Sequence, residues 1–194
     1  NGQTTDSQTA TLTVGWLIAH YAFDGNANDS SISANHGVWP VPALEAYNTT
    51  SPVVGTGAVI FAGNEPNVGS PDSYIDLGTD AVPNAQTQEG IRNGEGSASC
   101  WFKTSSSAAM AMCGIRNSGS SAFWMSLNEE VRGRVRVYVH GEDFGTVDLY
   151  ADPNDPNSIL DGQWHHVAFT WSEIAEDGRV YLDGQLLTTE VPTL

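Results

Sequence analysis

The stretch ILDGQWHHVAFTWSEIAEDGRVYLDGQLL, residues 159–187, decides the fold class of this chain. Apolar residues occupy every second position through WHHVAFTW (164–171) and GRVYL (178–182), a pattern typical of strands with one buried face. Only Asp183-Gly184 separates GRVYL from the following QLLTTE. This spacing predicts a tight β-hairpin, because glycine adopts positive φ without steric cost.

The same two-residue period recurs along most of the chain. Clusters of Gly, Pro, Asn and Asp separate the periodic segments, and no amphipathic helix of a dozen residues is found. So many short strands at this spacing predict an all-β fold, an antiparallel two-sheet sandwich or jelly roll. The other expected strands are LIAHYAF (17–23), GAVIFAG (57–63), SYIDLG (73–78), SASCWFKT (97–104), AMAMCGIR (109–116), AFWMSLN (122–128), RVRVYVH (134–140) and TVDLY (146–150).

Composition excludes two classes of partner. The chain has 194 residues, 23 of them acidic and 7 basic, and a formal net charge of -16. Nucleic acid and anionic membrane surfaces are therefore disfavoured, because both need clustered Lys and Arg. No apolar run approaches the roughly 20 residues of a membrane span, so we expect no membrane insertion. The length suits one domain.

Three segments together resemble one known family. LIAHYAFDGNANDSSISANHG (17–37), SASCWFKT and DGQWHHVAFTW are similar to the LamG-like jelly-roll family, relatives of laminin G domains and concanavalin A-like lectins. The resemblance spans about residues 16–190. It implies a two-sheet jelly roll that is extracellular or on the cell surface. Such modules often carry calcium and are appended to larger proteins for carbohydrate binding or adhesion.

The resemblance also raises expectations about the two ends. Family members continue past the LDGQL hairpin with closing strands, so we expect residues 15–194 to form a C-terminally incomplete jelly roll. Residues 1–14 contain TATLTV (9–14), and we interpret them as the tail of a preceding Ig-like domain or as an added edge strand. An open sheet edge recruits strands from neighbouring domains or chains. The alternative function is therefore a structural subunit of a surface layer, stalk or filament, assembled by strand exchange.

A short acidic loop is the candidate metal site. DGNANDSS (24–31) brings together Asp24, Asn26, Asn28 and Asp29. Ca²⁺ prefers six to eight oxygen ligands from carboxylates, amides, carbonyls and water. The alternative is an Asx-rich turn, which Asp and Asn close by themselves. Because the resemblance implies calcium, we expect these four residues to bind it.

A second set of residues is the candidate sugar-binding face. Alternation turns Trp124, Arg134, Arg136, Tyr138 and Tyr150 away from the core, and a hairpin would set Tyr138 opposite Asp148 and Arg136 opposite Tyr150. Aromatic rings supply flat apolar contact area, and Arg forms bidentate hydrogen bonds with carboxylate or sulfate. The face suits a polysaccharide or glycoconjugate, including an anionic one. The alternative, which the residues favour, is pairing of the arginines with Asp148, Glu129 and Glu130.

The two cysteines and the two adjacent histidines carry further predictions. A hairpin centred between Ser106 and Ser107 would place Cys100 opposite Cys113, which predicts either a cross-strand disulfide or two buried thiols. His165 and His166 are neighbours on a predicted strand, so they point to opposite faces and are not expected to chelate one metal ion.

Motifs for catalysis are not found. Jelly-roll glucanases carry Glu-x-Asp-x-(x)-Glu on one strand, because glycoside hydrolysis needs two carboxylates at a set separation. That run does not occur here, and neither do Gly-x-Ser-x-Gly or HExxH. The sequence therefore predicts a module that is not an enzyme and has no catalytic residues, with a glycoside hydrolase as the less favoured alternative.

Overall fold

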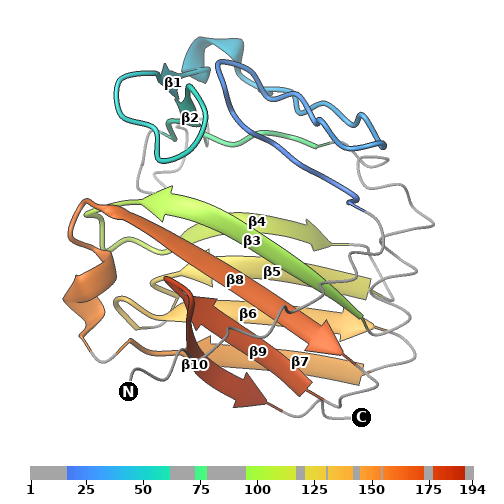
Figure 1. The fold of residues 1–194 in the computed structure, drawn as a ribbon, viewed down its shortest axis with the longest axis vertical. Helices are drawn as coiled ribbons and strands as arrows, with labels where there is room; N and C mark the ends of the chain where they lie inside the picture. The colour runs from blue at the N-terminus through green and yellow to red at the C-terminus, as the bar shows by residue number, and fades with distance from the viewer. Residues whose placement is uncertain are drawn as a thin grey trace, which may run out of the picture.

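The computed structural model describes residues 17–61, 73–77, 95–116, 121–129, 131–141, 145–153, 155–172 and 177–190. These residues form two stacked four-stranded antiparallel sheets and, beyond one edge of the stack, a lobe of residues 17–61 (Figure 1). The elements are η1 (Pro42–Leu44), β1 (Tyr47–Asn48), β2 (Ala58–Val59), β3 (Glu95–Lys103), β4 (Met110–Arg116), β5 (Ser121–Leu127), β6 (Val135–Gly141), β7 (Gly145–Ala151), η2 (Pro156–Ile159), β8 (Trp164–Ser172), β9 (Asp177–Leu182) and β10 (Gln185–Glu190).

Each sheet has a simple strand order. One runs β10-β9-β8-β3 and the other β4-β5-β6-β7, and every neighbouring pair is antiparallel. β9 and β10 are joined through Asp183-Gly184, whose φ angles of 49° and 78° match the positive values that a two-residue hairpin turn requires. The predicted hairpin is confirmed. The all-β, antiparallel jelly-roll prediction is confirmed with it.

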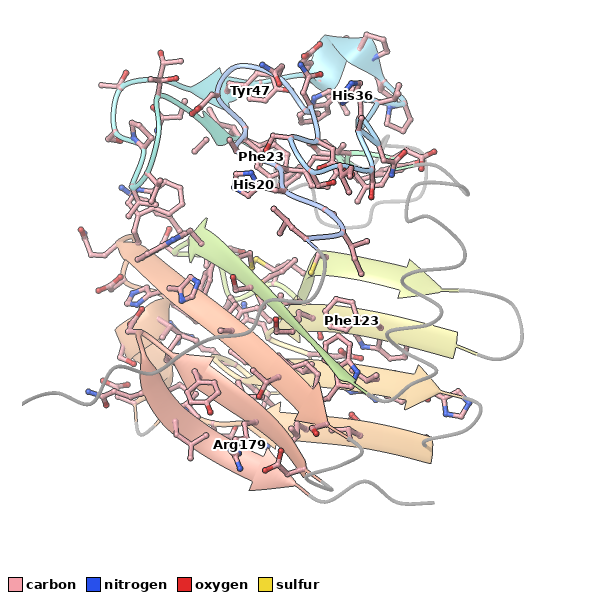
Figure 2. All side chains as sticks on the ribbon, turned by 45° about the vertical axis from the view of Figure 1, so that its right-hand side comes forward. His20, Phe23, His36, Tyr47, Phe123 and Arg179 are labelled. Atoms are coloured by element: carbon pink, nitrogen blue, oxygen red, sulfur yellow. The ribbon has the colours of Figure 1, made fainter. Side chains whose placement is uncertain are left out.

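The core lies between the two sheets. Val135, Val137 and Val139 of β6 are fully buried, and so are Val167 and Phe169 of β8. Phe123 of β5 stacks on Trp171 of β8, with ring centroids 5.8 Å apart, and so joins the two layers (Figure 2). The strand alternation predicted for these segments is therefore confirmed, with each alternate residue adding about 1.5–3 kcal/mol of hydrophobic stabilisation.

The N-terminal strand predictions are wrong. LIAHYAF forms no strand, and its contribution to pairing is one bridge between Tyr21 and Asp29. Leu17 is 53% exposed, and Phe23 has a φ of 57°, which interrupts an extended chain. The described part of GAVIFAG (57–61) contains only the two-residue strand β2, and the described part of SYIDLG contains only a bridge between Val38 and Asp76. The chain that begins with LIAHYAF instead folds back on itself, so that Tyr21 lies beside Asp29.

The hairpin predicted around Ser106 is also wrong. β3 and β4 lie in opposite sheets, so the chain crosses from one layer to the other between them. Asn128 holds this crossover, because its side-chain amide donates to the carbonyls of Ser106 and Ala108 at 3.0 and 2.9 Å. Local alternation cannot distinguish such a crossover from a hairpin.

The two cysteines therefore have other neighbours than predicted. Cys100 is paired with Val167, and Cys113 with Met125. Both thiols are free, which corrects the predicted disulfide and agrees with the alternative of two largely buried thiols. Burial raises the pKa of Cys100 to about 12 and that of Cys113 to about 11, so both stay protonated at neutral pH.

Some predictions fall on residues outside the described ranges. They include the domain boundary at residue 15, the TATLTV segment and Glu130. Within the described ranges, no helix has the length and apolar character needed to cross a membrane.

Candidate functional site

The five residues predicted for the sugar-binding face come together on the outer surface of β5, β6 and β7. Cross-strand pairing sets Trp124 opposite Tyr138, Tyr138 opposite Asp148, and Arg136 opposite Tyr150. The last two pairs confirm the predicted register. The side chains of the face point outward because the adjacent residues Met125, Val137 and Leu149 fill the core.

The aromatic rings of this face surround one guanidinium group. The rings of Trp124 and Tyr138 are stacked, with centroids 4.0 Å apart and an interplanar angle of 11°. The Arg136 guanidinium lies 5.0 Å from the centroid of Tyr150 and 5.5 Å from that of Trp124. Arg134 lies 5.2 Å from the same Tyr150 ring. Each such cation–π contact is worth about 0.5–1 kcal/mol at an exposed position.

Carboxylates hold both arginines in place. Arg136 donates from Nε and Nη2 to Asp148, both at 2.9 Å, and from Nη1 to Glu129 at 2.6 Å. Arg134 forms a bidentate pair with Asp152 at 2.8 and 2.9 Å. Pairing of Arg136 with Asp148 and Glu129 was the favoured prediction and is confirmed. Asp152 was missed, because it lies two residues beyond the strand predicted from alternation.

The charges on this face nearly cancel. Two guanidinium groups face three carboxylates, and the Arg136 side chain is 15% exposed. Hydrogen bonding by Asp148 raises the pKa of Arg136 above its usual range, and hydrogen bonding by Arg134 lowers the pKa of Asp152. The face therefore presents aromatic surface, fixed guanidinium donors and carboxylate acceptors, without an excess of positive charge.

Trp124 has unlike neighbours on the two strands beside it. Gly114 of β4 lies directly opposite Trp124 and carries no side chain. Tyr138 stacks on one side of the indole. The Trp124 side chain is half-buried between these two neighbours.

The four predicted calcium ligands have other partners. Asp29 is 4% exposed, and its carboxylate accepts from the amides of His20, Ser31 and Asn35 and from the Ser31 hydroxyl, at 2.8–3.0 Å. Four hydrogen bonds use all the lone pairs of a carboxylate. Burial raises the pKa of Asp29, but these hydrogen bonds outweigh it and leave the pKa lower than usual.

Two of the other three side chains are also engaged. Asp24 Oδ1 accepts from the amides of Thr56 and Gly57 at 2.6 and 2.8 Å, and Asn26 Oδ1 accepts from the Asn28 amide at 2.9 Å. The arrangement does not fit a calcium site built from all four residues, and it matches the alternative of an Asx-rich turn. Calcium binding stays a prediction from the resemblance.

The two adjacent histidines point to opposite faces of β8, as predicted. His166 lies beside Trp101, with ring centroids 4.9 Å apart. The ring nitrogens of His165 instead contact Asp183 at 2.8 Å and Asp161 at 3.2 Å. Alternation did not predict this Asp161–His165–Asp183 cluster, because Asp183 meets His165 only through the pairing of β9 with β8. Across the described ranges, no group of three or more His, Cys, Asp or Glu residues is arranged to hold a metal ion.

Comparison with known families settles the fold family. Residues 68–193, more than half of the chain, match the family model described as the concanavalin A-like lectin/glucanases superfamily. The chain belongs to this family. The LamG-like resemblance is confirmed, but the match begins after the N-terminal motif of residues 17–37.

Solved structures include a similar protein for this concanavalin A-like domain. The mouse laminin alpha1 chain, domains LG4-5, aligns with 18% identity and a TM-score of 0.43. The alignment covers 53% of this chain and a quarter (25%) of the laminin fragment. The comparison with curated proteins found no match.

Proposed function

We propose that this domain is a non-catalytic, extracellular carbohydrate-binding or adhesion module of a larger protein, and that it binds a neutral glycan on the outer face of β5–β7. The observation that carries the proposal is the stacked Trp124–Tyr138 pair beside carboxylate-held Arg136. Membership of a lectin and glucanase superfamily agrees with it, although a fold alone does not determine function.

The chemistry of the face favours a neutral glycan. A sugar ring offers an apolar C–H face and a rim of hydroxyl groups, which suit an indole ring flanked by acceptors and donors. Asp148 and Glu129 supply acceptors, and Arg136 supplies guanidinium donors whose orientation is already set. An anionic glycan would have to approach three carboxylates in a chain of net charge -16, which opposes its binding.

Glycan-array screening of the 194-residue chain, followed by titration calorimetry with the best glycan, tests this site. We expect Trp124→Ala and Tyr138→Ala to weaken binding about tenfold or more, which corresponds to about 1.4 kcal/mol. Trp101→Ala is the matched control, because Trp101 is an aromatic residue 45% exposed on β3 of the other sheet. An equal loss of glycan affinity in all three variants contradicts the proposal, and so does a failure of the chain to bind any neutral glycan.

The proposed lack of catalysis has its own test. The carboxylates of the face are engaged by arginine, and no strand carries the Glu-x-Asp-x-(x)-Glu run. We expect no release of reducing ends from laminarin, agar, carrageenan or mixed-linkage glucan. Release that disappears in Asp148→Asn or Glu129→Gln overturns this part of the proposal.

A structural role by strand exchange is the second candidate. Its supporting observation is the apolar surface of the lobe, where Ile32, Val38 and Val54 are 78%, 63% and 64% exposed. A neighbouring chain that covered these side chains would bury apolar surface. Sedimentation of the full chain at micromolar concentration, compared with residues 15–194, distinguishes the candidates. A monomer in both preparations rejects strand exchange.

A further inference from the structure

A cavity of about 320 Å³ opens in the lobe formed by residues 17–61. Its lining includes Ala27, Asn28, Gly37, Trp39, Glu45 and Tyr47. All these residues precede the segment matched by the family model, and none lies on the β5–β7 face. Figure 2 shows Tyr47 in the lobe, away from the two stacked sheets.

Backbone hydrogen bonds build the walls of this cavity. The Gly37 amide donates to the Ala27 carbonyl at 2.8 Å, which joins two lining residues. Val38 and Asp76 exchange two backbone hydrogen bonds, both at 2.8 Å. Trp39 is 6% exposed and its indole packs edge-on against Tyr47, with an interplanar angle of 86°. The cavity is therefore preformed, as ligand sites usually are.

A chain of polar contacts reaches the rim. The Trp39 indole N–H donates to the Tyr47 hydroxyl at 3.0 Å, and the hydroxyl in turn interacts with the Glu45 carboxylate. Burial raises the pKa of Tyr47, and the charge of the nearby Glu45 carboxylate raises it further. Glu45 and Asn28 both line the cavity with exposed side chains, which supply a carboxylate acceptor, amide donors and an amide acceptor.

We propose that this cavity binds one ring of a neutral sugar. The amide and carboxylate suit neighbouring hydroxyl groups, and exposed Val38 and Pro42 give apolar contact for ring C–H groups. The volume lies within the range of small-molecule sites, about 300–1,000 Å³. Glu45, the charged group of the lining, repels an anionic sugar, and comparison with a simple cation tests whether the same carboxylate attracts positive charge instead. The site does not depend on the function proposed for the β5–β7 face.

Tryptophan side-chain NMR of the full chain tests the site. The probes are methyl α-D-glucopyranoside, methyl α-D-galactopyranoside and methyl α-D-mannopyranoside, each titrated to 50 mM, with glucuronate and tetramethylammonium as charged comparisons. The Trp39 Nε1–H signal is assigned by its loss in Trp39→Phe. We expect a saturable shift of this signal with at least one neutral glycoside and with neither charged probe.

Variants locate the binding. Asn28→Ala and Glu45→Gln should each weaken the glycoside about tenfold, the size expected for one or two lost hydrogen bonds. Gln185→Ala removes an exposed amide on β10 and is the matched control. Trp124→Ala leaves the Trp39 shift unchanged, so failure of one site is distinguishable from failure of the other. No shift with any glycoside, a shift that survives both cavity variants, or a response only to tetramethylammonium or only to glucuronate overturns the proposal.

Discussion

At the residue scale, Asp29 shows how one buried carboxylate organises a segment that has no regular strand. It holds the amides of His20, Ser31 and Asn35. Asp29→Ala removes the acceptor and leaves three amides unpaired, which should cost about 3 kcal/mol. We expect faster hydrogen exchange of these amides and a lower melting temperature, both in EDTA and in calcium. If Asp29→Ala lowers the melting temperature only in calcium, the result contradicts this role and supports Asp29 as a metal ligand.

The direction of the Asp29 pKa shift predicts a pH dependence. Because its folded pKa lies below the ordinary value of 3.8, its contribution to stability is present above that pH and is lost as pH falls through the folded value. Protection of the lobe amides should therefore decline in acid more steeply in the wild type than in Asp29→Asn. Parallel pH profiles contradict the expectation.

The predicted binding of calcium is tested with a variant of Asp24. If the resemblance predicts correctly, millimolar calcium raises the melting temperature, because a ligand that binds only the folded state stabilises it by mass action. A hundredfold excess over the dissociation constant contributes about 2.7 kcal/mol. Asp24→Ala should remove the increment. Identical melting in EDTA and in calcium removes calcium from the description of this domain.

At the element scale, His165 connects the β9–β10 hairpin to the turn before β8. Its ring lies between Asp183 and Asp161, with Phe102 of β3 at 5.8 Å between centroids. Burial lowers the pKa of His165, but the two carboxylates outweigh burial and raise it above 6.5. Both carboxyl pKa values are lowered, so the cluster is fully charged in mild acid.

The sign of that shift predicts how the hairpin responds to pH. A histidine whose pKa is raised in the folded state stabilises the fold. This contribution is complete below the unfolded pKa of 6.5 and is lost as the pH rises through the folded pKa. The free energy of unfolding of the wild type, minus that of His165→Gln, should therefore be larger at pH 5.5 than at pH 9. Urea denaturation at both pH values measures it. An equal or reversed difference shows that the ion pairs do not contribute.

At the scale of the whole molecule, charge is the dominant imbalance. A formal net charge of -16 makes the folded chain repel itself. Raising NaCl from 10 to 100 mM shortens the Debye length from about 30 to about 10 Å and should raise the melting temperature. The Arg136 ion pairs are half-buried and are screened less. A melting temperature that falls with salt, measured by calorimetry, means that local ion pairs outweigh the net repulsion.

The stacked sheets were predictable because their signal is local. Val135, Val137 and Val139 alternate with outward residues. Successive side chains of a strand point to opposite faces, so the sequence alternates between residues suited to the core and residues suited to solvent. Asp183-Gly184 was predictable for a similar reason, since positive φ is a property of the residue itself. The outward face of Arg136 and Tyr138 followed directly from the core positions beside them.

Other features depend on which segments meet in space. Alternation alone could not tell that β3 and β4 lie in different sheets, because each strand's partner is chosen by hydrogen bonds to distant residues such as Val167 and Met125. The same holds for Asp152 beside Arg134 and for Asp183 beside His165. The sequence by itself determined the strands of the two stacked sheets, their buried faces and the tight turn. Only the tertiary structure decided the sheet of each strand, the partners of each charge and the cavity of the lobe, since long-range contacts carry no local period.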